Sequence, residues 1–283
     1  MLTINFLIEI TLALIMVSIG STIELNEIKE IFKKPKKIIV GLSMQMIFFP
    51  IIAIIIALIF PLQPEYKVGI ILLAACPGGT LSNYISYLIK ADIPLAVGLT
   101  SVNSLITIFT IPLFTFISFL VFFHNSVLIK VPFSSIALEL FFIVLIPVSI
   151  GILLKHKKAE KIKKLELPLK IISSILLLIV FSIKLFVNPS VSVSSATAHL
   201  LIPLILLNFL GLFLGYLLSK RFKLKNKSAT TVGVEVGLQN TILALLISDV
   251  VLKMPLVGYP AIIYATFSFI TSLIFAIIVI RRK

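Results

Sequence analysis

Two clusters of oxygen-bearing side chains interrupt long apolar stretches of this sequence. The first lies in residues 76–83 (CPGGTLSN) and the second in residues 233–240 (GVEVGLQN). Hydroxyl, amide and carboxylate oxygens suit hard cations such as sodium, whereas transition metals prefer imidazole or thiolate ligands. Because no histidine lies near either cluster, the residue types favour a sodium site over a transition-metal site.

Each cluster also breaks the apolar stretch that contains it. Pro77 removes a backbone donor and the glycines at 78 and 79 loosen a helix, while Glu235 places a carboxylate near the middle of its stretch. Irregular backbone and acids at membrane depth are tolerated where they line a cavity or are buried in protein. Close helix packing and hydrogen bonds back to helical carbonyls remain alternatives for either cluster alone. Two such breaks in comparable places of two halves of the chain indicate a secondary transporter built from inverted repeats.

The elements that must position these clusters are membrane-spanning helices. Of the 283 residues, 59% are hydrophobic and 13% charged, and the mean hydropathy is +1.20, which excludes an ordinary soluble domain. The first apolar run has no basic segment before it and no small-residue cleavage site, so it is expected to be a span rather than a signal peptide. Stretches long enough to cross a bilayer predict nine helices, at residues 6–22, 38–60, 68–88, 93–122, 134–154, 168–187, 199–219, 229–252 and 259–280.

The basic residues predict the orientation of these helices. With nine spans, 21 of the 25 lysines and arginines fall on alternate loops on one side. The positive-inside rule places that side in the cytoplasm, with the N-terminus outside and the C-terminus inside a cell membrane. The net charge of +14 therefore reflects topology, and no nucleic-acid partner is expected.

The motifs resemble those of the bile acid:sodium symporter family. The resemblance rests on residues 76–83, on residues 99–105 (LTSVNSL), on residues 235–240 (EVGLQN), and on Gln45 ahead of residues 48–50 (FFP). It covers nearly the whole chain in order, which makes residues 1–283 one integral membrane transporter domain. The family fold implies an all-α protein with two broken, crossing helices.

The resemblance also implies how the nine helices are grouped. The inverted repeats would hold four and five helices, with the first repeat at about 1–122 and the second at about 134–283. A core domain would comprise about 38–122 and 199–280, and a panel domain about 6–22 and 134–187.

The resemblance further implies two sodium sites and a substrate contact. The first sodium site would use the side chains of Ser82, Asn83, Thr100 and Glu235. The second would use Gln45 and Gln239 with backbone carbonyls around Glu235, Val236 and Leu238, and the substrate would touch Thr80 and Asn240. Many family members have a serine ligand four residues before Thr100, where this chain has Ala96, so the first site loses one oxygen.

These features predict a sodium-coupled symporter that imports a small organic anion by alternating access. The Ile/Leu/Lys-rich composition favours a microbial protein and a small metabolic carboxylate rather than a bile acid. A proton-coupled carrier or exporter of the same fold, with Glu235 as the proton site, remains an alternative. A non-transporting membrane sensor or subunit is a more distant one. An enzyme is not expected, because no nucleophile–base arrangement is recognisable.

Overall fold

The computed structural model describes residues 35–123, 146–157 and 193–281, together with a few single positions. Within these ranges the chain is helical, and the one β-type contact is an isolated bridge between Gly78 and Gln239. The predicted spans at 6–22 and 168–187 lie almost entirely outside the described residues. Of the predicted span at 134–154, the described part is chiefly helix α9 (Ile146–Lys157). The predicted nine-helix count and the repeats therefore stay predictions.

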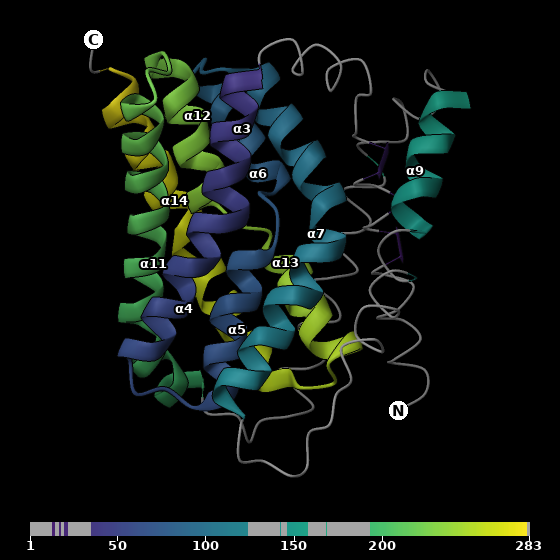
Figure 1. Cartoon of the computed structure of the whole chain (residues 1–283), viewed down its shortest axis with the longest axis vertical. Helices are drawn as coiled ribbons and strands as arrows, with labels where there is room; N and C mark the ends of the chain where they lie inside the picture. Colours follow the sequence, from purple (N-terminus) through teal and green to yellow (C-terminus); the bar gives the residue numbers. More distant parts are fainter. Residues whose placement is uncertain are drawn as a thin grey trace.

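Four of the predicted spans form long helices (Figure 1). Helix α3 (Pro35–Ser43), the π-helical turn η1 (Met44–Phe48) and α4 (Phe49–Ile59) follow one another without interruption. The other three are α7 (Ile93–Phe122), α11 (Val193–Arg221) and α14 (Tyr259–Ile280). By length and composition, residues 35–59, 199–221 and 255–280 each suffice to cross a membrane. Helix α7 would be a fourth span, bent by 57° between residues 107 and 109.

The two remaining predicted spans are broken, as the sequence predicts. Helix α5 (Pro64–Ala75) ends at Cys76 and α6 (Thr80–Leu88) begins after Gly79. Cys76 is extended (φ −70°, ψ 155°), the conformation that a following proline enforces. Helix α12 (Asn226–Gly237) is likewise separated from α13 (Thr241–Leu246), which continues into the π-helical turn η3 (Ile247–Val251) and the short 3-10 helix η4 (Pro255–Gly258).

The two breaks contact each other. Besides the bridge from Gly78 to Gln239, the backbone N–H of Asn240 donates to the carbonyl of Pro77 at 2.9 Å. Each break therefore satisfies backbone groups that the other leaves without a helical partner. The oxygen clusters that follow the breaks are thereby brought together.

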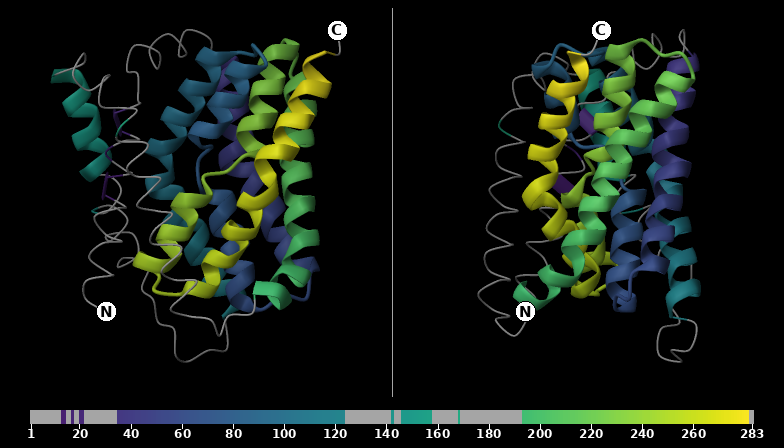
Figure 2. Two further views of the ribbon diagram at one scale, coloured as in Figure 1. Left: turned by 180° about the vertical axis from the view of Figure 1, so that it is seen from behind. Right: turned by 90° about the vertical axis from the view of Figure 1, so that its left-hand side faces the viewer.

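Helices α11 and α12 approach each other through glycines spaced four residues apart on both. A Cβ added at Gly211 would lie 3.2 Å from the Cα of Gly237, and one at Gly215 would lie 3.1 Å from the Cα of Gly233. Such paired small residues let two membrane helices pack backbone to backbone. Helix α14 runs alongside both (Figure 2), so α12 is held between long neighbours.

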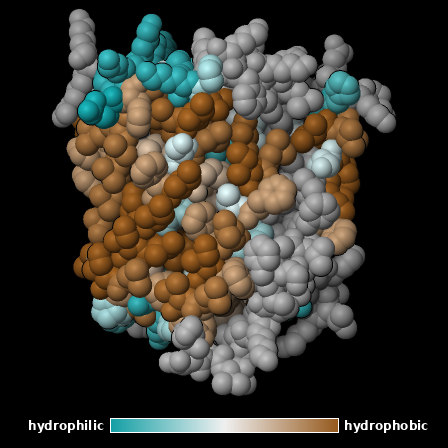
Figure 3. All heavy atoms as spheres, viewed as in Figure 1, coloured by the Kyte–Doolittle hydropathy of each residue, from teal (hydrophilic) through white to brown (hydrophobic). Residues whose placement is uncertain are grey.

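The outer face suits a lipid environment. Figure 3 shows a broad hydrophobic band with hydrophilic residues at the two ends of the molecule. Large apolar side chains stand exposed on the long helices, among them Ile39, Ile55, Phe109, Ile202 and Ile270. An apolar surface of this size indicates a membrane or protein interface. With the apolar helices, it marks an integral membrane protein.

Candidate cation site at the crossing of the two breaks

The carboxylate of Glu235 is buried at the crossing, with 1% of the residue exposed. The hydroxyl of Ser82 on α6 donates to Oε2 at 2.6 Å, and that of Thr100 on α7 donates to Oε1 at 2.7 Å. Three helices thus place these three predicted ligands in direct contact. Both donors are neutral, so they orient the carboxylate without balancing its charge.

Oxygen acceptors outnumber the hydroxyl protons around this carboxylate. The Ser82 hydroxyl also lies 2.6 Å from the carbonyl of Gly79. The Thr100 hydroxyl also lies 3.2 Å from Oδ1 of Asn83 and 3.0 Å from the carbonyl of Ala96. Each hydroxyl carries one proton and can satisfy one of these acceptors at a time. The carbonyl of Gly79 also accepts from the backbone N–H of Ser82 at 3.1 Å. The carboxylate and Oδ1 of Asn83 still offer oxygens that a hard cation would bind, so the residues present fit sodium.

The break between α5 and α6 leaves room for the carboxylate because residue 78 is glycine. A Cβ added to Gly78 would lie 2.2 Å from Oε1 and 2.4 Å from Cδ of Glu235. The neighbouring Gly79 is not crowded, since the nearest atoms to its added Cβ lie 3.9 Å away. Residue 78 must therefore lack a side chain so that the Glu235 carboxylate fits beside it. This requirement is separate from the helix-breaking role that the sequence predicts.

Gln45 and Gln239 form a second polar group beside the first. Nε2 of Gln45 donates to Oε1 of Gln239 and to the carbonyl of Cys76, both at 2.9 Å. Nε2 of Gln239 donates to the carbonyl of Val236 at 2.6 Å and to Oε1 of Gln45 at 3.3 Å. The group offers amide and backbone oxygens to a cation. A bound cation would take the place of the hydrogen bonds between the two amides. Leu238 is buried next to it.

Gln45 lies in the wide turn η1, just before Pro50. The backbone N–H of Phe49 donates to the carbonyl of Met44, five residues back. Pro50 has no N–H to offer to the preceding turn, which accounts for the local widening. π-helical turns of this kind often mark functional positions.

One part of the site is not recognisable from the sequence. At the end of α12, the carbonyl of Gly237 accepts hydrogen bonds from Asn208 Nδ2 at 2.7 Å and from the Tyr264 hydroxyl at 2.6 Å. Thr271 donates to Oδ1 of Asn208 at 2.7 Å and fixes that amide. A single amide within the apolar residues 199–219 was the only available signal. These side chains anchor the break from α11 and α14.

The two predicted substrate contacts are only partly placed. Asn240 caps α13, because its Oδ1 accepts from the backbone N–H of Leu243 at 3.0 Å. Thr80 begins α6, and its side chain lies outside the described part of the structure. Their contact with substrate stays a prediction.

Known proteins match most of this chain in sequence. Residues 9–195 match the Sodium Bile acid symporter family. The hepatic sodium/bile acid cotransporter of Rattus norvegicus is 31% identical over 254 residues, covering 90% of this chain and 70% of the relative. The uncharacterized sodium-dependent transporter YocS of Bacillus subtilis is 29% identical over 234 residues, 83% of this chain and 71% of the relative. A probable chloroplastic sodium/metabolite cotransporter of rice, BASS2, is 26% identical over 255 residues, 90% of this chain and 59% of the relative.

Proposed function

Because this chain belongs to the sodium bile acid symporter family, a family of transporters rather than enzymes, we propose that it imports a small organic anion together with sodium. The observation that carries the proposal is the buried Glu235 carboxylate, which two neutral hydroxyls from two other helices contact. A buried charge without a counter-charge is costly, and a bound sodium ion would supply one. The names of the relatives, sodium/bile acid and sodium/metabolite cotransporters, support the same coupling ion.

The first proposed sodium site comprises Ser82, Asn83, Thr100 and Glu235. The second comprises Gln45 and Gln239 with the backbone carbonyls of Glu235, Val236 and Leu238. Two sodium ions and one monoanionic substrate would balance Glu235, so the loaded carrier could change conformation with little unpaired charge. The substrate would lie near Thr80 and Asn240. A small carboxylate would supply the single negative charge.

The driving force of this stoichiometry is sufficient. A tenfold sodium gradient supplies about 1.4 kcal/mol per ion. Two sodium ions with a monoanion move one net charge, worth about 2.3 kcal/mol per 100 mV. The total of about 5 kcal/mol supports accumulation on the order of a thousandfold.

We further propose how the chain sits and moves. The panel, residues 6–22 and 134–187, would move against the core, residues 38–122 and 199–280, to give alternating access. The N-terminus would face outward and the C-terminus the cytoplasm of a cell, by the distribution of basic loops.

A sodium titration of thermal stability tests the function. The purified protein is expected to melt at a higher temperature in sodium than in potassium or choline at equal ionic strength. A ligand at a hundred times its dissociation constant stabilises the native state by about 2.7 kcal/mol. Equal melting curves in all three salts, with uptake that follows pH instead, would favour the proton-coupled alternative, in which the same Glu235 carries the proton.

Replacing Ala96 by serine tests the first site. Ala96 is buried one helical turn before Thr100, and its carbonyl already lies 3.0 Å from the Thr100 hydroxyl. Ala96→Ser adds an oxygen on this turn and is expected to lower the half-saturating sodium concentration by roughly threefold to tenfold, the equivalent of one modest ligand interaction. Sodium-dependent uptake measures the shift. An unchanged sodium curve would mean that position 96 does not face the cation.

A further inference from the structure

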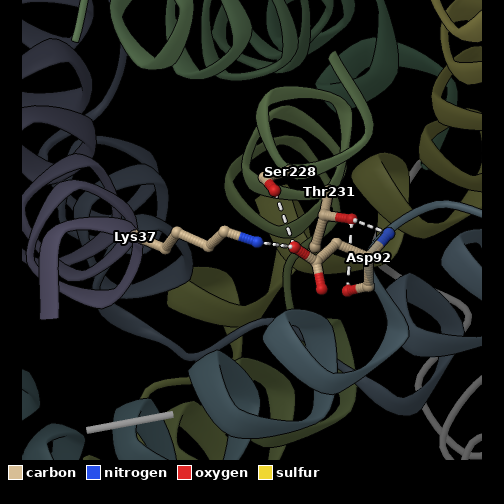
Figure 4. A network of polar contacts seen from close by, with 4 residues as sticks. All are labelled: Lys37, Asp92, Ser228 and Thr231. Carbon is tan, nitrogen blue, oxygen red and sulfur yellow. Dashed lines mark hydrogen bonds and ion pairs between the residues drawn. The ribbon is translucent and has the colours of Figure 1, made fainter. Parts of the chain in front are cut away.

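A charged cluster lies at the end of the core where α3, α7 and α12 begin (Figure 4). Its centre is Asp92, in the connection from α6 to α7. Oδ2 of Asp92 contacts the Lys37 ammonium at 2.5 Å and accepts from the Ser228 hydroxyl at 2.6 Å. The backbone N–H of Asp92 donates to the Thr231 hydroxyl at 3.1 Å.

This one residue links the elements that supply the candidate cation ligands. Asp92 joins α6, which carries Ser82 and Asn83, to α7, which carries Thr100. Its side-chain partners lie on α12, which carries Glu235, and on α3, which leads into the turn of Gln45. From the sequence alone, Lys37 is expected only to add to the positive charge of a cytoplasmic loop.

The cluster sets the register of α7 against α12. Thr231 precedes Glu235 by four residues, so the two lie one turn apart on one face of α12. Asp92 precedes Thr100 by eight residues, about two turns of α7. The same two helices therefore meet twice, at Asp92 with Thr231 and at Thr100 with Glu235. A shift of α12 at the first contact would therefore be carried along the two helices to the second.

The Asp92 carboxyl is ionised at neutral pH because its pKa is lowered. Burial raises the pKa of the Asp92 carboxyl, but hydrogen bonds from Lys37 and Ser228 and the charge of Lys37 outweigh burial and hold it below its ordinary value. A lowered folded-state pKa means that the contribution to stability is present above the unfolded-state pKa and is lost only as pH falls through the folded-state pKa. The side chains of Lys37 and Asp92 are 29% and 17% exposed, so this ion pair is less screened than a fully exposed surface pair.

We propose that Asp92 is a positioning residue for the first cation site, fixing α12 against α6 and α7 so that Glu235, Ser82 and Thr100 meet at coordinating distance. The inference rests on the proposed function, since it concerns the affinity of that site for sodium. Outer residues that orient metal ligands typically control affinity without touching the ion. Asp92 would act on the sodium affinity in this way, because its contacts hold α3, α6, α7 and α12 together.

The test compares sodium affinity with sodium-free stability in the purified full chain. Asp92→Asn keeps the shape of the side chain and removes its charge, and Thr231→Val removes only the hydroxyl that accepts from Asp92. Asp92→Asn is expected to raise the half-saturating sodium concentration in thermal-shift titrations by about tenfold, and Thr231→Val to raise it in the same direction. Asp92→Glu should restore part of the affinity.

A matched control separates positioning from general destabilisation. Val257→Ala removes buried volume in η4, next to the start of α14. It is expected to lower the sodium-free melting temperature and leave the half-saturating sodium concentration unchanged. The inference is overturned if Asp92→Asn and Thr231→Val lower the melting temperature but keep the wild-type sodium affinity. It is also overturned if Val257→Ala weakens sodium binding equally. A wild-type protein without any sodium response would instead overturn the proposed function.

Discussion

Glu235→Gln is expected to abolish sodium-dependent uptake while the protein still inserts and folds. The amide has nearly the size of the carboxyl group, and the hydroxyls of Ser82 and Thr100 can rotate to accept from it as well as donate to it. The cation loses its formal counter-charge. At about 4 Å and an effective dielectric constant near 20, one opposite charge contributes about 4 kcal/mol, so sodium affinity should fall by roughly a thousandfold.

Uptake into proteoliposomes and sodium-dependent melting measure this loss together. Glu65→Gln is the matched control, because it makes the same chemical change in the first turn of α5, away from the candidate cation site. It should transport like the wild type. Normal sodium-dependent uptake by Glu235→Gln would remove this residue from the cation site. Loss of uptake with a retained sodium shift in melting would place Glu235 in conformational change rather than in cation binding.

The breaks were predictable because their causes are local. Pro77 has no backbone N–H to donate, and the glycines after it weaken a helix. Residues 93–122 form α7 with the predicted bounds. Ser82 and Thr100 were expected either to ligate or to bond back to helical carbonyls. In the structure, the Thr100 hydroxyl lies near both the carbonyl of Ala96 and the carboxylate of Glu235. Both contacts form because this turn of α7 faces α12.

The long-range contacts were not predictable from residue patterns alone. The sequence around residue 78 does not indicate that a side chain there would clash with the carboxylate of Glu235. Asn208 and Tyr264 meet the carbonyl of Gly237 only because α11 and α14 pack on either side of it. The pairing of Lys37 with Asp92 was not predictable for another reason. The number of basic residues in a loop indicates its side of the membrane, but the partner of one lysine depends on which helix ends lie close together.

Gly78→Ala should weaken sodium coupling strongly, although less than loss of the carboxylate does. Since no described glycine has a positive φ, alanine suits the backbone at 78, and the expected defect is purely steric. The added Cβ would lie 2.2 Å from Oε1 and 2.9 Å from Oε2 of Glu235, so the carboxylate must leave its contacts with Ser82 and Thr100. Overpacking of this kind costs about 1–3 kcal/mol, which predicts a tenfold to hundredfold rise in the half-saturating sodium concentration.

Gly79→Ala controls for the neighbouring backbone, because its added Cβ has no atom nearer than 3.9 Å. This variant should keep the wild-type sodium curve in the same uptake assay. The double variant Gly78→Ala/Glu235→Asp, whose acid is shorter by one methylene, should recover part of the sodium affinity if the clash is the cause. A wild-type sodium curve for Gly78→Ala alone would show that the carboxylate works from a position clear of residue 78, and the contact geometry with Ser82 and Thr100 would then not be the one that binds the cation.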